Sequence, residues 1–269
     1  MKTLSNPGVN HDQIASLLTD ARMNTRPVTQ LSKQGISLER SDAYSIQESG
    51  ILFREKAGER KIGLKMGLTS EGKRKQMNLD SPLYGELTDK MQIRADEKLN
   101  ISQLIHPKIE PEIAFLLKQD LEGIVTVEQV LEATSAVCAC LEILDSRYEQ
   151  FKYFSMEDVI ADNSSSSHFI LGSWYENFRS LDLRSLSMKM FVNGELAHEA
   201  LSSEISGDPA VSIVELCRLL SQRKRKLTRG TVVLAGAATA AVSLSGGMKV
   251  TLEVKGLPPV GIEVQGLKQ

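Results

Sequence analysis

The sequence predicts an α+β protein in which a helical N-terminal region precedes a longer, β-rich body. Apolar residues recur at helical spacing up to about residue 60. From residue 61 onwards, most segments alternate apolar and polar residues with the period of a strand. We therefore expect a helical region at residues 1–60 and a β-rich domain at residues 61–269.

The N-terminal region contains two predicted helices. Residues 12–21 and 43–57 carry apolar side chains at helical spacing, and Arg26-Pro27 separates them. This part has no recognisable chemistry. We expect it to pack on the main body or on a neighbouring subunit.

The composition is that of an ordinary globular protein. The 269 residues, 41% hydrophobic and 25% charged, allow a sizeable core, and a formal net charge of −2 creates no field that would attract nucleic acid. No apolar run reaches the ~18 residues of a membrane span, and no signal peptide is visible. We expect a cytoplasmic protein with a small ligand. Cys138, Cys140 and Cys217 lack metal-type spacing and are expected to be buried thiols.

A strand is predicted at residues 60–70, and Lys65 lies on its non-apolar face. The neighbours of Lys65 on that face include Gly63 and Gly67, whose missing side chains would leave space for a small ligand beside the amine. An exposed strand lysine is the alternative. After this strand, Thr69 or Ser70 is expected to cap a short helix through Met77 that favours a carboxylate.

The next segment, residues 78–88, is predicted to be a turn-rich loop. Such loops often close over sites.

Two carboxylates share one face of a predicted strand at residues 105–117. Period-2 alternation sends Glu110 and Glu112 out of the same side, while Ile109, Ile113 and Phe115 occupy the other. In apolar surroundings such a pair repels unless one member is protonated or a cation lies between them. A metal ion would resolve the conflict. An edge strand with two solvated glutamates is the alternative.

A third carboxylate, Glu142, follows in a second strand-like segment, residues 139–148, after a capped helix expected from Thr126 to about Val137. Three acidic ligands without histidines suit Mg²⁺ or Mn²⁺ better than zinc or copper. Alternatively, Glu142 forms a buried ion pair with Arg147 or with a lysine.

Four serines, Ser164 to Ser167, stand between apolar runs and so do not form a linker. Their hydroxyl groups, with Asp162 and Asn163, could line a polar pocket wall and hydrogen-bond a carboxylate. Serine-rich turns without a ligand are the alternative.

Four ordered motifs, at residues 65–70, 109–115, 141–147 and 161–167, together resemble a known family. They are similar to motifs of the 4-oxalocrotonate decarboxylases and 2-oxopent-4-enoate hydratases of catechol meta-cleavage, in the fumarylacetoacetase-like superfamily. The resemblance covers nearly the whole chain. It implies an N-terminal helical region packed on a largely antiparallel β-roll.

The resemblance also implies the roles of the site residues. Glu110, Glu112 and Glu142 would be the ligands of Mg²⁺ or Mn²⁺. The candidate catalytic residues are Lys65, Leu83 and Arg147, and the candidate substrate-binding residues are Thr69, Ser70, Tyr84, Asp162, Asn163, Ser164 and Ser167.

Leu83 favours the decarboxylase branch. Hydratases of this family tend to carry an acidic residue immediately before the aromatic-Gly pair, where a carboxylate could activate water, but this chain has Leu83 before Tyr84-Gly85. We therefore expect metal-dependent conversion of 2-oxo-3-hexenedioate (4-oxalocrotonate) to 2-oxopent-4-enoate and CO₂. The ion would act as a Lewis acid, which makes an imine-forming lysine unnecessary.

The last third departs from the family pattern at Asp208, where relatives tend to have histidine, and at Ala235, where they tend to have a hydroxyl residue. These departures leave three alternatives open: a hydratase, a C–C hydrolase of the same superfamily, or a non-catalytic partner subunit of a hydratase. The ligand should be a small 2-oxo dicarboxylate. By resemblance we expect a homo-oligomer, and a complex with 2-oxopent-4-enoate hydratase is possible.

Overall fold

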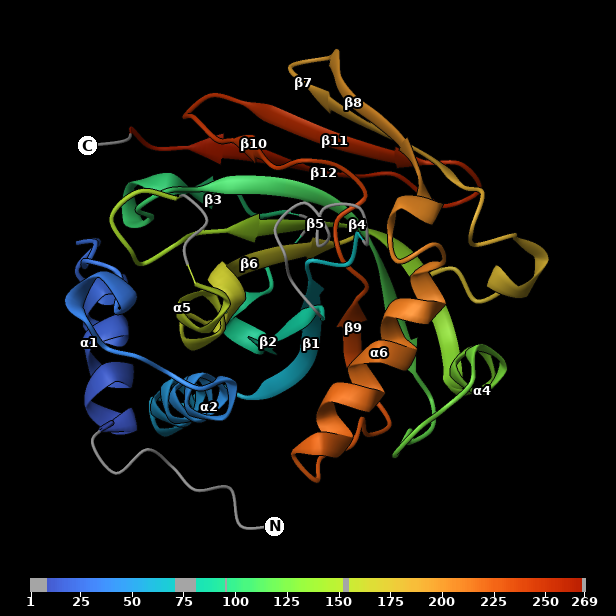
Figure 1. The fold of residues 1–269 in the computed structure, drawn as a ribbon. Coiled ribbons are helices and arrows are strands. Elements are labelled where there is room, and N and C mark those ends of the chain that lie inside the picture. Colours follow the sequence, from blue (N-terminus) through green and yellow to red (C-terminus); the bar gives the residue numbers. More distant parts are fainter. Residues whose placement is uncertain (1–8, 71–80, 95, 152–154, 268–269) are drawn as a thin grey trace.

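The computed structural model describes residues 9–70, 81–94, 96–151 and 155–267, and contains two packed β-sheets with helices on two sides. In Figure 1, α1, α2 and α5 lie on one side of the molecule, and α4 and α6 lie on the other. The strands β7, β8, β11 and β12 form a layer above both groups. The expected α+β fold class is confirmed.

The two predicted N-terminal helices are present. Helix α1 spans His11–Met23, and its N-cap Asn10 accepts from the backbone N–H of Gln13. Helix α2 spans Arg40–Lys56 and begins at a capping box formed by Glu39 and Asp42. The helix predicted at residues 43–57 therefore matches α2 except for the first turn of α2.

The larger sheet carries the candidate site. Its strand order is β2-β1-β9-β4-β5-β6, with β10 paired to β4, and every pair is antiparallel except β1 with β9. The bounds are β1 Lys61–Gly67, β2 Leu83–Thr88, β4 Lys108–Leu117, β5 Thr134–Leu144, β6 Ser166–Leu171, β9 Val232–Leu234 and β10 Val242–Ser243.

The smaller sheet has the order β3-β12-β11-β7-β8 and is antiparallel except between β12 and β3. Its strands are β3 Leu99–Asn100, β7 Ser187–Val192, β8 Glu195–Leu201, β11 Lys249–Val254 and β12 Val260–Gln265. A hairpin at Asn193-Gly194 joins β7 to β8, and both residues adopt the positive φ that such a turn requires.

The remaining helices are α4 Val127–Ala133, α5 Met156–Ala161 and α6 Pro209–Gln222. Short 3-10 turns are η1 Ser32–Gln34, η2 Asp89–Met91, η3 Ile101–Gln103, η4 Asn163–Ser165, η5 Phe178–Ser180 and η6 Ser202–Glu204. The capping box of Thr126 and Gln129 opens α4 as predicted. The predicted end near Val137 is wrong: β5 begins at Thr134, because this segment pairs with β4 along its whole length.

The turn-rich loop expected at residues 78–88 is wrong over residues 83–88, whereas Ser81 and Pro82 lie outside regular secondary structure. Leu83–Thr88 forms strand β2, buried throughout and paired with β1. Residues 78–80, and the helix expected through Met77, lie outside the described residues.

One hydrophobic core joins the N-terminal helices to both sheets. It includes Ile14 of α1, Ile46 of α2, Ile113 of β4 and Val250 of β11. Secondary structure changes from helix to strand between Lys56 and Lys61. The division into parts at residue 60 stays a prediction.

Candidate functional site

Strand pairing brings the three candidate metal ligands together. On β4, Glu110 and Glu112 lie two residues apart and so point to one face, and Glu142 of β5 lies directly opposite Glu110. One carboxylate oxygen from each residue lies within 4.8 Å of the others. Because β4 pairs with β5 and β9, it is an interior strand, and the edge-strand alternative is wrong.

Each of the two inner carboxylates has a fixed neighbour. Glu142 Oε1 accepts from the hydroxyl of Ser166 at 2.8 Å, and Lys65 Nζ lies 3.0 Å from Glu142 Oε2. Glu112 Oε2 accepts from the backbone N–H of Gly236 at 2.8 Å. These contacts hold the carboxylates side by side instead of letting them separate.

The cluster is buried and carries excess negative charge. Glu112 and Glu142 have no exposed surface, and Lys65 is 3% exposed, so the exposed-lysine alternative is wrong. Burial raises the pKa of Glu112 well above its usual value, and the charge of Glu142 raises it further. Burial lowers the pKa of Lys65, but the charges of Glu142, Glu112 and Glu110 outweigh it and raise that pKa overall.

These residues fit a hard divalent cation. Three carboxylates face one ammonium group, and Glu112 Oε1 is buried without a hydrogen-bond partner among the described residues. A dipositive ion would balance the charge and use that oxygen, and carboxylate oxygens are the ligands preferred by Mg²⁺ and Mn²⁺.

The two glycines that flank Lys65 have different neighbours. A Cβ on Gly63 would lie 2.3 Å from the carbonyl oxygen of Val232, so this glycine admits the parallel strand β9. A Cβ on Gly67 would lie 2.7 Å from Leu83 Cδ1. The expectation is therefore wrong for Gly63, whereas Gly67 lines the pocket beside the Lys65 amine, and a Cβ there would lie 3.7 Å from Lys65 Nζ.

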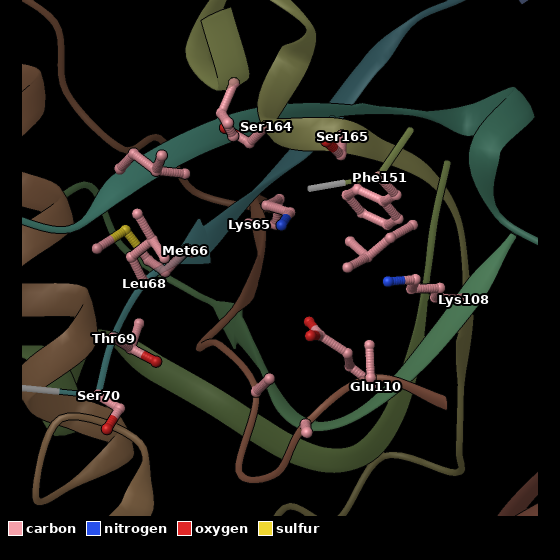
Figure 2. Close-up of a pocket in the computed structure, with 17 residues that line it drawn as sticks. Lys65, Met66, Leu68, Thr69, Ser70, Lys108, Glu110, Phe151, Ser164 and Ser165 are labelled. Carbon is pink, nitrogen blue, oxygen red and sulfur yellow. The ribbon is translucent and has the colours of Figure 1, made fainter. Parts of the chain in front are cut away.

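A pocket of about 400 Å³ adjoins the cluster. Figure 2 shows the Lys65 amine, the Lys108 amine and the Glu110 carboxylate directed into it. Five of the expected site residues line this pocket besides Glu110, namely Lys65, Thr69, Ser70, Leu83 and Ser164. It is large enough for a small dicarboxylic acid.

Strand alternation separates Leu83 from its neighbour Tyr84. Leu83 of β2 lines the pocket, whereas the Tyr84 ring is buried on the other face and stacks on Tyr44 at 4.4 Å between centroids. Ser167 also lies outside the pocket lining, and its hydroxyl is 2.8 Å from His168 Nδ1. The substrate-binding roles expected for Tyr84 and Ser167 are therefore corrected.

Arg147 and Asp162 form an internal ion pair and do not line the pocket. The Arg147 guanidinium also donates to the carbonyl oxygens of Asp145, Asp162 and Ser166. Its donors are used within the protein, so the catalytic role expected for Arg147 and the substrate contact expected for Asp162 are corrected. The pair instead fixes the chain around the serine segment.

The side chain of Asn163 likewise contacts the protein backbone and does not line the pocket. Its side chain accepts from the backbone N–H of Glu86 at 2.8 Å and donates to the Glu86 carbonyl at 2.9 Å. Asn163, Ser164 and Ser165 all have positive φ, a conformation that places Ser164 and Ser165 in the pocket wall. Ser164 donates to the Tyr84 carbonyl at 2.7 Å.

Sequence reasoning missed two residues of the pocket, Lys108 and Phe151, whereas Ser165 belongs to the serine run that was expected in the pocket wall. The Lys108 amine lies 4.3 Å from the centroid of the Phe151 ring. The alternation that aligned Glu110 with Glu112 also places Lys108 on that face, so this residue was detectable. Phe151 lies after strand β5, outside any helix or strand, where no alternation of residue types could indicate a pocket residue.

The two departures from the family pattern leave the carboxylate cluster unchanged. Asp208 is the N-cap of α6 and lies outside the pocket lining. Ala235 is buried, and the next residue, Gly236, still donates to Glu112. A Cβ on Gly236 would lie 2.5 Å from the Thr69 side chain, so glycine is required here.

Comparison with known proteins agrees with this geometry. Residues 74–265 match the family model described as fumarylacetoacetate (FAA) hydrolase C-terminal. A 4-oxalocrotonate decarboxylase from Pseudomonas sp is 39% identical over 94% of this chain and 98% of its own length. A 2-hydroxyhexa-2,4-dienoate hydratase from Comamonas testosteroni is 35% identical over 91% and 94%.

A solved relative has nearly the same structure. The 4-oxalocrotonate decarboxylase from Pseudomonas putida G7, complexed with magnesium and adipate, superposes with a TM-score of 0.92 at 33% identity and covers 98% of this chain and 100% of its own. The same enzyme has also been solved with calcium and acetate. A divalent metal is thus bound by a close relative.

The fold and the carboxylate cluster define the chain as an enzyme of the fumarylacetoacetate hydrolase type. It belongs to the fumarylacetoacetate hydrolase family, in the group that contains 4-oxalocrotonate decarboxylases and the related hydratases. The resemblance drawn from the four motifs, and the β-roll it implied, are confirmed. Among the described helices, none combines the length and the apolar character needed to cross a membrane.

Proposed function

We propose that this enzyme is a carboxy-lyase that converts 2-oxo-3-hexenedioate to 2-oxopent-4-enoate and CO₂. The observation that carries the proposal is a cluster of three glutamates and a buried lysine beside a pocket lined by Leu83. By the family resemblance, hydratases tend to carry an acidic residue at this position. The decarboxylases among the relatives support the same reaction.

Glu110, Glu112 and Glu142 would hold the Mg²⁺ or Mn²⁺ ion. When bound, the ion supplies Lewis-acid polarisation of the 2-oxo group, an effect worth several kcal/mol of barrier. The hydroxyl of Ser166 and the N–H of Gly236 keep two of the ligands in position.

Two lysines give the pocket affinity for a doubly charged acid. Lys65 lies at the cluster, where it would attract the carboxylate next to the 2-oxo group, and Lys108 lies farther along β4, where it would attract the distal carboxylate. The pocket wall between and around them is largely apolar and includes Leu83, Leu144 and Val159. Such a wall excludes water and favours the change from a charged carboxylate to neutral CO₂.

The proposed reaction breaks the bond to the distal carboxyl carbon, which leaves as CO₂. The bond's electron pair moves through the conjugated chain to the 2-oxo oxygen and gives a dienolate. A proton then returns to carbon to yield 2-oxopent-4-enoate. Lys65, whose raised pKa keeps it protonated, would orient the acid by charge or manage this proton.

The test is product identity. Purified protein loaded with Mg²⁺ or Mn²⁺ would be incubated with 2-oxo-3-hexenedioate while CO₂ and 2-oxopent-4-enoate are measured. Stoichiometric release of both is expected. Hydration of added 2-oxopent-4-enoate without CO₂ release would identify a hydratase. Hydratase activity is the second candidate function, because hydratases such as the C. testosteroni enzyme are among the relatives.

The same assay addresses the assembly. Turnover by the purified chain alone would exclude a non-catalytic partner subunit. Addition of a separately purified 2-oxopent-4-enoate hydratase, followed by size-exclusion chromatography with light scattering, would test the homo-oligomer and the complex that we propose from the family resemblance.

A further inference from the structure

A second cavity lies at the boundary between the N-terminal helices and the β-rich body. Its volume is about 40 Å³, and its wall includes Arg22 of α1, Arg54 of α2 and Arg147, which follows β5. Figure 1 shows α1, α2 and α5 together at this boundary. None of these arginines lines the pocket beside Lys65, so the two cavities are separate.

Two of the three arginines around this cavity are in ion pairs. Arg54 Nη1 lies 3.3 Å from Glu59 Oε2, and Arg147 is paired with Asp162. The side chain of Arg22 has no ion pair or hydrogen bond with any residue in the described part of the chain. Among the described residues, the three guanidinium groups therefore form two ion pairs, and Arg22, which is partly buried, forms none.

The surroundings of Arg22 disfavour its charge. Burial lowers the pKa of Arg22 to about 10, and repulsion by Arg54 and Arg147 acts in the same direction. A guanidinium group nevertheless stays protonated at neutral pH. A smaller attraction by Glu59 opposes these effects, and a further negative group in the cavity would offset them more fully.

Within the described chain, the same wall contains an unpartnered polar atom. Gln47 lines the cavity and is 2% exposed. Its Nε2 donates at 3.0 Å to the carbonyl oxygens of Tyr84 and Ile160, which fixes the orientation of the amide. Its Oε1 is buried and has no hydrogen-bond partner among the described residues. A water molecule in the cavity would donate to this oxygen.

The size of the cavity limits what it can hold. One water-sized species needs at least about 10–15 Å³ measured in this way, so the cavity accepts about three such species. A halide with one or two waters fits this volume.

We propose that this cavity binds a small monovalent anion, such as chloride, between the guanidinium groups of Arg22 and Arg54, with a water molecule on Gln47 Oε1. The anion gives Arg22 a charge partner. It thereby joins α1 and α2 to the Arg147–Asp162 pair, which holds the segment that carries Ser164 and Ser165. This proposal is independent of the reaction that the enzyme catalyses.

Bromide provides a direct test, because it replaces chloride and scatters anomalously. Crystals of the full chain soaked in sodium bromide should show an anomalous peak in this cavity, near Arg22 and Arg54. The peak should be absent in crystals of Arg22→Gln. A wild-type cavity that contains only water at high bromide concentration would overturn the proposal.

Thermal unfolding provides a second test that needs no crystals. At equal ionic strength, sodium chloride should raise the wild-type Tm above its value in sodium gluconate, by about 2–4 °C at ten times Kd. Arg22→Gln should lose this difference and should be at least as stable as wild type in gluconate, because it removes the unmatched charge. Arg26→Gln, an exposed arginine just beyond α1, is the matched control and should keep the chloride effect.

Two outcomes of this second test count against the anion site. One is an equal chloride effect in wild type and Arg22→Gln. The other is a large loss of stability of Arg22→Gln in gluconate, which would indicate that Arg22 makes favourable contacts with the protein itself. A sodium bicarbonate arm at the same ionic strength distinguishes a halide site from one that prefers a small oxyanion.

Discussion

The Lys65 amine lies 3.0 Å from Glu142 Oε2 in a position where neither side chain is more than 4% exposed. Lys65 comes from β1 and Glu142 from β5, and strands β9 and β4 lie between them in the sheet. The contact therefore depends on the curvature of the sheet, which brings both side chains over the same face. A buried cation at this distance neutralises one of the three carboxylates and leaves two for a divalent ion.

Replacing the lysine should separate catalysis from metal binding. Lys65→Met is expected to lower kcat by about 100-fold or more, because the pocket loses the charge that orients the acid or its proton. Mn²⁺ should bind at least as tightly, since the carboxylate cluster becomes more negative. Steady-state kinetics and calorimetric Mn²⁺ titration check both parts. Lys61→Met, on the same strand but exposed, is the control. A fall in metal affinity as large as the fall in kcat would contradict the assignment of Lys65 to catalysis.

Glu112→Gln should stabilise the metal-free protein and weaken metal binding. The pKa of Glu112 is raised by burial, so its ionised form disfavours folding at pH 7, and the neutral amide removes that cost. An increase of about 1 kcal/mol or more in the free energy of unfolding is expected without metal. Mn²⁺ affinity should fall at least about 100-fold. Urea denaturation with and without Mn²⁺ measures both, with exposed Glu195→Gln as the control. Lower stability of the metal-free variant would argue against a strained carboxylate.

Lys108 should select for a second carboxylate. Lys108→Met is expected to weaken binding of adipate about 10- to 100-fold in the presence of Mg²⁺, because a desolvated charge pair is lost. Binding of hexanoate, which has one carboxylate, should change by less than about threefold on the same argument. Calorimetry with both ligands tests this, and Lys118→Met at the exposed end of the same strand segment is the control. Equal losses of affinity for adipate and hexanoate would indicate that Lys108 contributes only to packing.

Leu83 should decide between decarboxylation and hydration. Leu83→Asp places a carboxylate in the pocket wall, where it would repel the distal carboxylate of 2-oxo-3-hexenedioate and could activate water. CO₂ release should fall, and hydration of 2-oxopent-4-enoate should appear or increase. Leu83→Asn is the control, because asparagine has the shape of aspartate without its charge. Unchanged CO₂ release by Leu83→Asp would remove the basis for preferring a decarboxylase.

His168 should make the fold sensitive to mild acid. Burial, followed by the charges of Arg54 and Arg22, lowers the pKa of His168 to about 4, with a smaller opposing effect of Glu59. The unfolded chain takes up a proton near pH 6.5, so this stabilising contribution is complete above pH 6.5 and is lost as the pH falls toward 4. The full effect is about 3 kcal/mol.

Unfolding of wild type and His168→Gln at several pH values tests this expectation. The variant should lose less stability than wild type between pH 6.5 and pH 4.5. His198→Gln on the edge strand β8 is the control. Parallel pH profiles for wild type and His168→Gln would show that His168 titrates normally.

Local alternation was enough to find the chemical face of β4. Because side chains on a strand alternate with period 2, Glu110 and Glu112 had to share a side, and the same rule places Lys108 with them. The hairpin at Asn193-Gly194 and the cap at Asp208 were also predictable, since each depends on residues adjacent in sequence.

Errors arose where a nearby polar residue was assumed to face the ligand. Arg147 and Asp162 satisfy one another, and Tyr84 points away from Leu83 because the segment is a strand and not a loop. Proximity in sequence to a site residue did not distinguish these supporting roles from contact with the pocket.

The sequence by itself determined the residue types, the strand faces and the family. The register that sets Glu142 opposite Glu110, the convergence of Lys65 from a distant strand and the enclosure of the pocket by Phe151 were decided only by the tertiary structure. The physical reason is the distance along the chain over which each effect acts. Backbone geometry imposes periodicity within a few residues, whereas register and sheet curvature result from packing between segments that are far apart in the chain.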